Sequence, residues 1–345
     1  MFGKKVVTKP IKIGVIGAGS WGTAIAILLA KNGHRVHLWV RNTDQIQRLN
    51  SDRENKKYLT RIFFPENLSV HSDLEKCIKK SNTVVMVIPS HGFREVFSQC
   101  LPLISSGQNI VSAVKGIENK TLKTMTQVMD EVIIEQRNEK KGLNVGVLSG
   151  PSFAEEVARN VPTAVTIGFT KKEKAVEIQQ IFASKTFRVY TSTDVIGLEI
   201  SAALKNIIAI ATGVCDGLGY GLNTRAALIT RGLSEIMRLG MALGAKKETF
   251  SGLSGLGDLI LTCTGDLSRN RTVGVKLGEG KTLVQVQKEM RMVAEGIKTT
   301  QSVFDLSRNL NVEMPILEQV YNILYKGKDC AQAVKDLLER QMREE

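Results

Sequence analysis

The stretch IKIGVIGAGSWGT, residues 11–23, decides the fold of the first half of the chain. It places three glycines in the spacing G-x-G-x-x-G, between an apolar β-branched run and a helix-forming run. In that setting Gly17 allows a tight turn, Gly19 lets the backbone approach a pyrophosphate, and Gly22 lets the helix pack closely on the strand. The flanking runs disfavour the alternative, in which the glycines serve steric purposes alone. We therefore predict a dinucleotide site, with the pyrophosphate at the N-terminus of the helix.

Short apolar runs alternate with helical ones from this stretch to about Tyr190. Near-continuous Val/Ile strands separated by helices are typical of a parallel sheet that is covered on both faces. The predicted strands cover residues 11–18, 35–40, 83–89, 109–116, 144–150, 162–169 and 187–194, with a helix from 171 to 184 between the last two.

The pattern changes after Asp194, where strand-like runs give way to long segments of helical periodicity separated by Gly-rich turns. A chain of 345 residues is also long for a single core. We predict an α/β protein with an N-terminal Rossmann-type parallel-sheet domain over residues 1–194 and a C-terminal all-α domain over residues 195–345.

The formal net charge of +13 favours an anionic ligand, but charge alone does not say which one. No basic run of five or more residues occurs and only 5% of the residues are aromatic, so nucleic acid is not a favoured partner. No run of about 18 apolar residues is evident, so stable membrane insertion is not expected. Five scattered cysteines indicate neither a disulfide framework nor a metal site, and they favour a cytoplasmic location.

The residue at the end of the second predicted strand bears on the choice of cofactor. Dinucleotide folds often place an acidic residue about 20 positions past the glycines to bind the ribose hydroxyls, but here the strand is followed by Arg41. A guanidinium pairs with a 2′-phosphate, which favours NADPH and leaves NADH possible; a solvated loop arginine is the alternative. Ser20 and Trp21 are predicted to face the phosphates and the nicotinamide side. His91 is interpreted as a solvated loop residue and not as a catalyst.

Two lysines stand out as candidates for chemistry. Lys115 closes the fourth predicted strand beside a glycine, and Lys205 lies in an otherwise apolar helix, where it shares its face with small and apolar side chains. Such a setting lowers the pKa of a lysine toward the range that a general acid/base needs, whereas snorkelling to water is the alternative. Asn206, next to Lys205, is a candidate for positioning a ligand. Ser152, after Gly150, either caps the following helix or contacts substrate.

Two clusters follow in the helical half. A Gly-rich turn brings Asp258 into position to approach a ligand. The run Ser268, Arg269 and Asn270 offers a hydroxyl, a guanidinium and an amide, a combination that suits a phosphate, although an ordinary polar turn looks similar. Glu295 lies in a further turn that alone indicates little.

Nine motifs occur in order between about Ile11 and Leu338: GAGSWGTA, IPSHGF, VKGIE, SGPSFA, ALKN, GLGDL, LTCTGDLSRNR, VAEG and EMPI. Together they resemble the NAD(P)-dependent glycerol-3-phosphate dehydrogenases of bacterial type. The resemblance implies a Rossmann domain for NAD(P)H and a helical substrate domain. It also implies reduction of dihydroxyacetone phosphate to sn-glycerol 3-phosphate for phospholipid synthesis, and a homodimer.

The resemblance also assigns roles by position. Lys205 matches the family's proton donor and acceptor, and Lys115 matches the lysine that holds and polarises the substrate. The predicted catalytic residues are Lys205, Lys115 and Asp258. The predicted substrate-binding residues are Lys115, Gly150, Ser152, Lys205, Asn206, Asp258, Ser268, Arg269 and Asn270. The predicted cofactor-binding residues are Gly17, Gly19, Ser20, Trp21, Gly22, Arg41, Lys115, Ala154, Arg269, Val293 and Glu295. No metal is predicted.

Two other functions fit parts of the sequence. A β-hydroxyacid dehydrogenase has a similar layout with a helical lysine, and it requires a carboxylate substrate. A non-catalytic NAD(P)-binding sensor requires the loss of at least one of Lys115, Lys205 and Asp258, yet all three are present.

Overall fold

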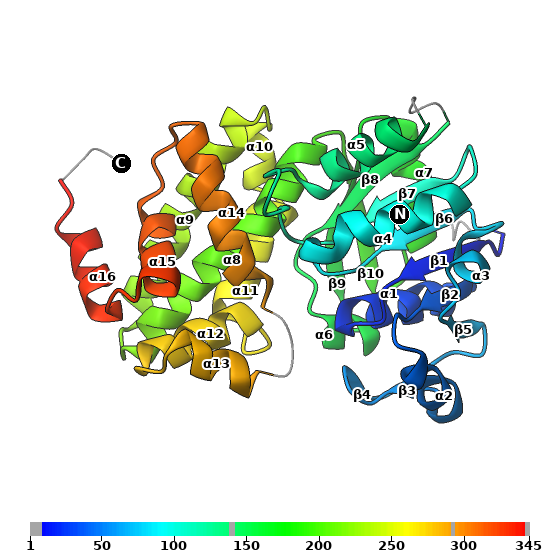
Figure 1. Ribbon diagram of the computed structural model, residues 1–345, viewed down its shortest axis with the longest axis horizontal. Helices are drawn as coiled ribbons and strands as arrows, with labels where there is room; N and C mark the ends of the chain where they lie inside the picture. The colour runs from blue at the N-terminus through cyan, green and yellow to red at the C-terminus, as the bar shows by residue number, and fades with distance from the viewer. Residues whose placement is uncertain (1–8, 138–141, 291–293, 342–345) are drawn as a thin grey trace. The chain divides into compact units, whose positions relative to one another are not determined.

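The computed structural model describes residues 9–137, 142–290 and 294–341, and the chain divides into two compact units (Figure 1). The sheet unit comprises residues 1–114 and 125–195, and the helical unit comprises residues 115–124 and 196–345. The segment 115–124 therefore belongs with the helices, although it was predicted within the first domain. Ile117 explains this difference, since it is buried in the hydrophobic core of the helical unit.

An eight-stranded sheet forms the centre of the sheet unit, in the order β10-β9-β8-β7-β6-β1-β2-β5 (Figure 1). Its strands are β1 Lys12–Ile16, β2 Arg35–Trp39, β5 Leu68–His71, β6 Thr83–Met86, β7 Asn109–Ser112, β8 Asn144–Ser149, β9 Thr163–Phe169 and β10 Phe187–Ser192. The mostly parallel sheet confirms the predicted fold class. The sequence did not predict β5 or the separate hairpin of β3 Glu54–Asn55 and β4 Leu59–Phe63.

The sequence predicted a parallel sheet, but one pair of neighbouring strands is antiparallel. β9 pairs antiparallel with β8, and β10 pairs parallel with β9, so the last two strands at this side of the sheet run opposite to the other six. A parallel neighbour needs a crossover that spans the sheet, usually a full helix. Between β8 and β9 the chain has only the five-residue helix α6 Ala154–Ala158, and it returns as an antiparallel strand.

Helices cover both faces of the sheet because its side chains alternate between two cores. Besides α6, the α-helices described in this unit are α1 Ser20–Lys31, α2 Thr43–Asp52, α3 Leu74–Ile78, α4 Phe93–Cys100, α5 Met125–Arg137 and α7 Lys172–Phe182. Ile13 and Val15 pack in the core that contains α1, whereas Ile16 packs in the core that contains α4 and α5.

The helical unit is built around α8 Val195–Gly217, which is buried along most of its length. By length and a mean hydropathy of 1.6, α8 is apolar enough to cross a membrane, a property that was not predicted from the sequence. However, 83% of that apolar window is buried inside the protein, as expected for a core helix. The other elements are α9 Leu222–Ala242, α10 Lys247–Phe250, the π-helical turn η3 Leu253–Gly257, α11 Asp258–Thr264, α12 Arg269–Gly278, α13 Leu283–Glu289, α14 Glu295–Asn309, α15 Pro315–Lys326 and α16 Cys330–Leu338.

Candidate active site

The glycine loop between β1 and α1 has the backbone geometry that a dinucleotide site requires. Gly17 has φ +120°, a conformation that L side chains rarely adopt, and a Cβ there would lie 2.3 Å from the carbonyl oxygen of Val87. A Cβ at Gly22 would lie 1.8 Å from the carbonyl oxygen of Gly17, so the helix packs directly on the turn. At Gly19, no atom of the described residues beyond the adjoining backbone lies within 4 Å of a Cβ position, so this side of the loop is open.

The start of α1 has no side-chain cap. Gly19 is the N-cap residue of α1 and has no side chain to accept from the first amides of the helix, and Ser20 begins the helix. The indole Nε1 of Trp21 is buried and has no hydrogen-bond partner among the described residues. An open backbone at Gly19, at the N-terminus of a helix, fits the phosphates of a dinucleotide.

Arg41 follows β2 and is accessible. Its Nη2 lies 3.8 Å from Oε1 of Glu95, and the two side chains are 75% and 62% exposed. An ion pair this exposed contributes little, so the guanidinium remains available to an anionic ligand. The adjacent Asn42 caps α2 by accepting a hydrogen bond from the amide of Asp44 at 2.8 Å.

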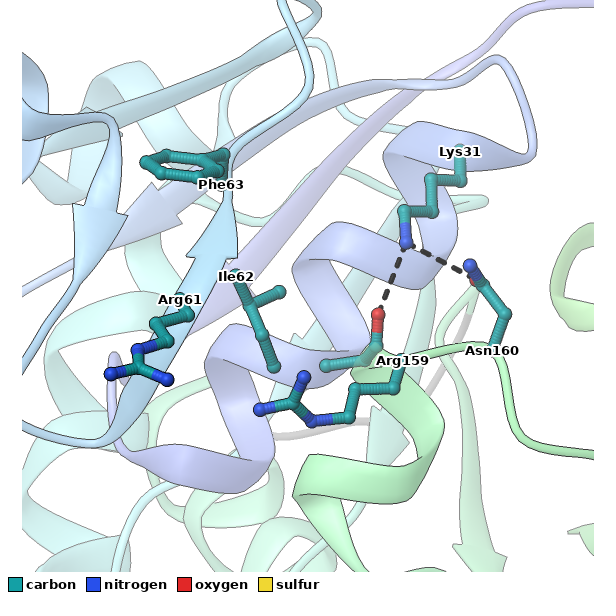
Figure 2. A pocket seen from close by; sticks show the side chains of 7 residues that line it. Lys31, Arg61, Ile62, Phe63, Arg159 and Asn160 are labelled. Atoms are coloured by element: carbon teal, nitrogen blue, oxygen red, sulfur yellow. Dashed lines mark hydrogen bonds between the residues drawn. The ribbon is translucent and has the colours of Figure 1, made fainter.

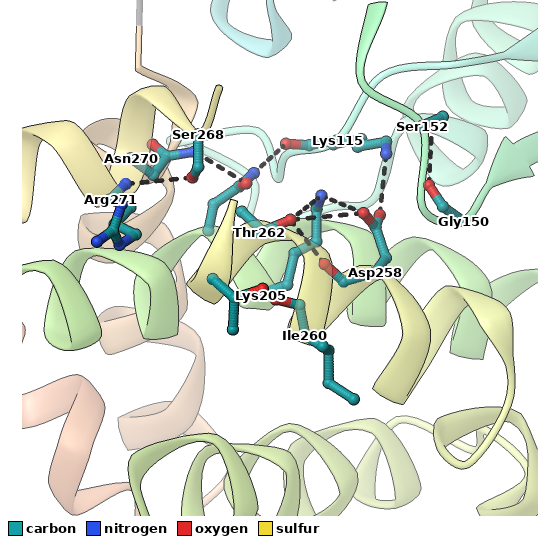
Figure 3. Close-up of polar contacts among 12 residues, drawn as sticks. Lys115, Gly150, Ser152, Lys205, Asp258, Ile260, Thr262, Ser268, Asn270 and Arg271 are labelled. Atoms are coloured by element: carbon teal, nitrogen blue, oxygen red, sulfur yellow. Dashed lines mark hydrogen bonds and ion pairs between the residues drawn. The ribbon is translucent and has the colours of Figure 1, made fainter. Parts of the chain in front are cut away.

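The segment after β8 contains three further predicted residues. Gly150 has φ +133°, and Ser152 Oγ donates to the carbonyl oxygen of Gly150 at 2.9 Å (Figure 3). Ala154 is the first residue of α6 and packs against the core that contains α1. The N-cap position of α6 is Phe153, so the interpretation of Ser152 as the capping residue was wrong.

The helical unit brings three predicted catalytic residues together (Figure 3). Lys205 Nζ lies 2.6 Å from Oδ1 of Asp258, and Lys115 Nζ lies 2.9 Å from Oδ2 of the same carboxylate. The side chain of Asp258 is fully buried, and those of Lys205 and Lys115 are 7% and 17% exposed. One carboxylate therefore bridges two ammonium groups, which leaves the cluster with a net positive charge when all three are ionised.

The chain builds this cluster from two short segments packed on α8. Lys205 projects from the middle of α8, and Asp258 begins α11 directly after the π-helical turn η3. Lys115 was predicted to lie at the end of a strand, but β7 ends at Ser112. Lys115 therefore lies in the segment that follows the strand. Its segment is held by the bridge between Ile117 and Thr124.

Burial decides the acid/base character of Lys205. Desolvation lowers its pKa to about 8, although the attraction of Asp258 acts in the opposite direction and repulsion from Lys115 adds to the lowering. Snorkelling to water is excluded for this lysine, because its ammonium is held inside the protein. A lysine with a pKa of about 8 is mostly protonated near neutral pH and also releases its proton readily.

Thr262 is a fourth member of the cluster, and the sequence analysis did not include it among the site residues. Its Oγ donates to the carbonyl oxygen of Asp258 at 2.6 Å and accepts from Lys205 Nζ at 2.7 Å. Asp258 and Thr262 are four residues apart on α11, and this spacing places both on one helix face. The four-residue spacing from Asp258 is the signal in the sequence that could have placed Thr262 in the site.

A chain of side-chain amides extends from Lys115 to the start of α14. Asn206 Nδ2 donates to the carbonyl oxygen of Lys115 at 3.3 Å, and Asn270 Nδ2 donates to Asn206 Oδ1 at 2.9 Å. Asn270 Oδ1 in turn accepts from the backbone amide of Gly296 at 3.0 Å. Each side-chain NH2 group has two hydrogens, and the hydrogen bonds of this chain of amides use one hydrogen of each group.

The other predicted site residues of the helical unit are close in sequence to Asn270 or to Gly296. Ser268 is buried and caps α12 by accepting from the amide of Arg271 at 3.2 Å. Arg269, the first residue of α12, is exposed, and Glu295 is the first residue of α14. Val293 lies outside the described residues.

A groove of about 350 Å³ lies at the other end of α1 from the glycine loop (Figure 2). Lys31, Arg61 and Arg159 line it together with Ile62 and Phe63. Lys31 Nζ donates to the carbonyl oxygen of Ala158 at 3.1 Å. The groove contains none of the predicted site residues, so it is separate from both the glycine loop and the lysine cluster.

Comparison with known proteins identifies the family. Residues 12–175 match the family model for the N-terminus of NAD-dependent glycerol-3-phosphate dehydrogenase, and residues 194–335 match the model for its C-terminus. The chain belongs to the glycerol-3-phosphate dehydrogenase family. The family and the fold class predicted from the sequence are thereby confirmed.

Individual relatives agree with this assignment. The chain is 56% identical over 333 residues to a glycerol-3-phosphate dehydrogenase [NAD(P)+] of Desulfotalea psychrophila, which covers 96% of the chain and 98% of the relative. It is 50% identical over 335 residues to one of Syntrophotalea carbinolica, covering 97% and 99%. The crystal structure of a glycerol-3-phosphate dehydrogenase of Coxiella burnetii matches with a TM-score of 0.91 at 40% identity, covering 96% of this chain and 99% of that one.

Proposed function

We propose that the chain catalyses the NAD(P)H-dependent reduction of dihydroxyacetone phosphate to sn-glycerol 3-phosphate. The observation that carries the proposal is the buried cluster of Lys205, Asp258 and Lys115, in a member of the glycerol-3-phosphate dehydrogenase family. Ketone reduction needs a proton for the oxygen atom and positive charge beside it, and the two ammonium groups offer both.

The glycine loop is the proposed site of the cofactor. Gly17, Gly19 and Gly22 would hold its pyrophosphate against the amides that open α1, with Ser20 and Trp21 beside them. When bound, the nicotinamide supplies a hydride to the carbonyl carbon of the substrate. Ala154, Val293 and Glu295 remain proposed cofactor contacts from the family resemblance.

The lysine cluster supplies the proton. An ammonium has three N–H donors, and Asp258 and Thr262 accept two of those of Lys205, which leaves one for the carbonyl oxygen of the substrate. As that oxygen gains negative charge, Lys205 transfers a proton to it and Lys115 stabilises the charge that develops. Asp258 holds both ammonium groups on one carboxylate and so fixes their separation.

The phosphate of the substrate is the proposed ligand of residues near the start of α12. Arg269 supplies a forked cation and Asn270 an amide donor that also bonds to Asn206. Ser268, the N-cap residue of α12, supplies a hydroxyl. Binding the phosphate fixes the carbonyl relative to Lys205, because the whole triose phosphate is short. Gly150 and Ser152 of the sheet unit remain proposed substrate-binding residues.

The pKa of Lys205 leads to a prediction for the pH dependence of both directions. Reduction needs the protonated lysine, so its kcat/KM should fall as the pH rises through about 8. Oxidation of glycerol 3-phosphate needs the neutral lysine, so its kcat/KM should rise over the same range. Initial rates in both directions on either side of this pH test the assignment. Two profiles with the same slope would contradict it.

We propose that Arg41 gives the chain a preference for NADPH over NADH. Arg41→Asp should lower the ratio of kcat/KM for NADPH to that for NADH by roughly 100-fold, since a charge-assisted contact to the 2′-phosphate is replaced by repulsion. Arg35→Asp is a matched control, because Arg35 is an exposed arginine at the opposite end of β2. An equal change of the ratio in both variants would assign the preference to overall charge and not to Arg41.

A substrate comparison separates this proposal from a β-hydroxyacid dehydrogenase. Purified protein with NADPH should oxidise the nicotinamide when dihydroxyacetone phosphate is added and should not act on a β-hydroxyacid in the presence of NADP. The two ligands differ in their anionic group, a phosphate against a carboxylate. Activity on the hydroxyacid alone would establish the other function.

We further propose a homodimer in the cytoplasm that supplies glycerol 3-phosphate for phospholipid synthesis. Support for the location comes from the five cysteines, all of which are free. The molar mass in solution, measured by light scattering, tests the dimer.

A further inference from the structure

We infer that Asn55 is a positioning residue that holds the glycine loop in its cofactor-binding shape. Neither the sequence motifs nor the proposed mechanism uses this residue, which lies in the hairpin of β3 and β4. The inference rests on the proposed use of NAD(P)H at the glycine loop. Its basis is a pair of hydrogen bonds from one buried side chain.

The side-chain amide of Asn55 contacts the glycine loop on both sides of Gly19. Nδ2 donates to the carbonyl oxygen of Ala18 at 3.0 Å and to Thr23 Oγ at 2.9 Å. Asn55 is 4% exposed and Thr23 is fully buried. A carbonyl oxygen only accepts hydrogen bonds, so the amide nitrogen of Asn55, and not its oxygen, must face Ala18.

The bond to Ala18 also determines where the next amide points. The carbonyl of Ala18 and the N–H of Gly19 belong to one trans peptide plane, in which they point in opposite directions. Fixing the Ala18 oxygen toward Asn55 therefore directs the Gly19 N–H away from Asn55. No described residue lies within 4 Å of a Cβ position at Gly19, so an anion has room to approach the loop beside this donor.

The bond to Thr23 holds the other side of the loop. Thr23 lies in the first turn of α1, and its backbone amide donates to the carbonyl oxygen of Gly19 at 2.9 Å. Asn55 thus connects the residue before Gly19 with the first turn of the helix after it. Without Asn55, the peptide plane between Ala18 and Gly19 is free to rotate, and the cofactor must restore its orientation on binding.

The chain offers a matched control at the other end of the same helix. Asn67 Nδ2 also donates two hydrogen bonds, to the carbonyl oxygens of Ala30 and His34, both at 2.7 Å. Ala30 lies near the C-terminal end of α1, which is about 18 Å long. Asn67→Ala therefore also removes two hydrogen bonds of a side-chain amide, at an exposed position and without affecting the glycine loop.

The experiment measures NADPH binding by the full chain in the absence of substrate, together with hydrogen exchange of residues 17–23 in the cofactor-free protein. Asn55→Ala should raise the Kd for NADPH roughly tenfold and accelerate exchange in this segment. Asn67→Ala should leave the Kd and the exchange of residues 17–23 within about twofold, even where both variants lower Tm equally. Thr23→Val, which removes one acceptor and conserves shape, should raise the Kd by a smaller factor.

An unchanged NADPH Kd in both Asn55→Ala and Thr23→Val would overturn the inference, as would an equal loss of affinity in Asn67→Ala. Should Asn55→Ala fail to fold, Thr23→Val alone decides, and a wild-type Kd in that variant counts against the inference. Because no substrate is present, the result does not depend on the proposed reaction. Wild-type protein that binds NADPH but does not reduce dihydroxyacetone phosphate would overturn the reaction alone.

Discussion

Lys205→Met is expected to lower kcat for dihydroxyacetone phosphate reduction by about 10²- to 10⁴-fold, the range that general acid catalysis contributes. Methionine has a similar length but no proton to donate. The Kd for NADPH should stay at its wild-type value, since Lys205 is buried against Asp258 and is not among the proposed cofactor contacts. Steady-state rates and NADPH titration measure the two quantities.

Lys281→Met is the control, because Lys281 is a partly exposed lysine of the same unit that pairs with Glu289 at 2.7 Å. It should retain wild-type turnover. Lys205→Arg should be nearly as inactive as Lys205→Met, because a guanidinium keeps its charge but does not release its proton. Substantial turnover in Lys205→Arg would show that positive charge, and not proton transfer, is what the reaction needs from this position.

Asp258→Asn is expected to have the second largest effect, a loss of about 100-fold or more in kcat/KM near neutral pH. The carboxylate of Asp258 raises the pKa of Lys205 against the effect of burial, so its removal should lower that pKa below about 8. A larger fraction of Lys205 is then neutral in the pH range of the assay, and neither ammonium is held in place. The pH at which reduction declines should therefore move downward, as a full profile of kcat/KM against pH will show.

Asp266→Asn is the matched control for Asp258→Asn. Asp266 also pairs with a cation, Arg271, at 3.0 Å, but its side chain is 97% exposed. The same chemical change at this position should leave both the rate and the pH profile unaltered. A variant of Asp258 that lost activity with an unshifted profile would indicate that the carboxylate only supports the fold.

The features that the sequence predicted well are those encoded locally. The glycine loop was predictable because Gly17, Gly19 and Gly22 each meet a local steric requirement of a dinucleotide site, and their spacing is visible in the sequence. The burial of Lys205 was predictable because its neighbours on one helix face are small or apolar, and the structure buries that whole face. In both cases residues within about two helical turns carry the information.

Features that depend on contacts between distant segments were not predicted. Lys115 and Asp258 are 143 residues apart, and no local pattern in the sequence indicates that one carboxylate bridges both lysines. The hydrogen bonds of Asn55 connect residues 32 and 37 positions away. The strand β9 was predicted, but its antiparallel direction was not, because strand direction depends on how the connecting segment crosses the sheet.

A comparison of dihydroxyacetone phosphate with dihydroxyacetone as substrates for NADPH oxidation, with the product identified by chromatography, is the decisive measurement for the proposed reaction. We expect kcat/KM for the phosphorylated ketone to be roughly 10²- to 10⁴-fold higher, since charge-assisted contacts to the phosphate position the carbonyl beside Lys205. The product should be glycerol 3-phosphate, formed in equal amount to the NADPH consumed. Equal rates with both ketones, or no oxidation with dihydroxyacetone phosphate, would rule out the proposed reaction.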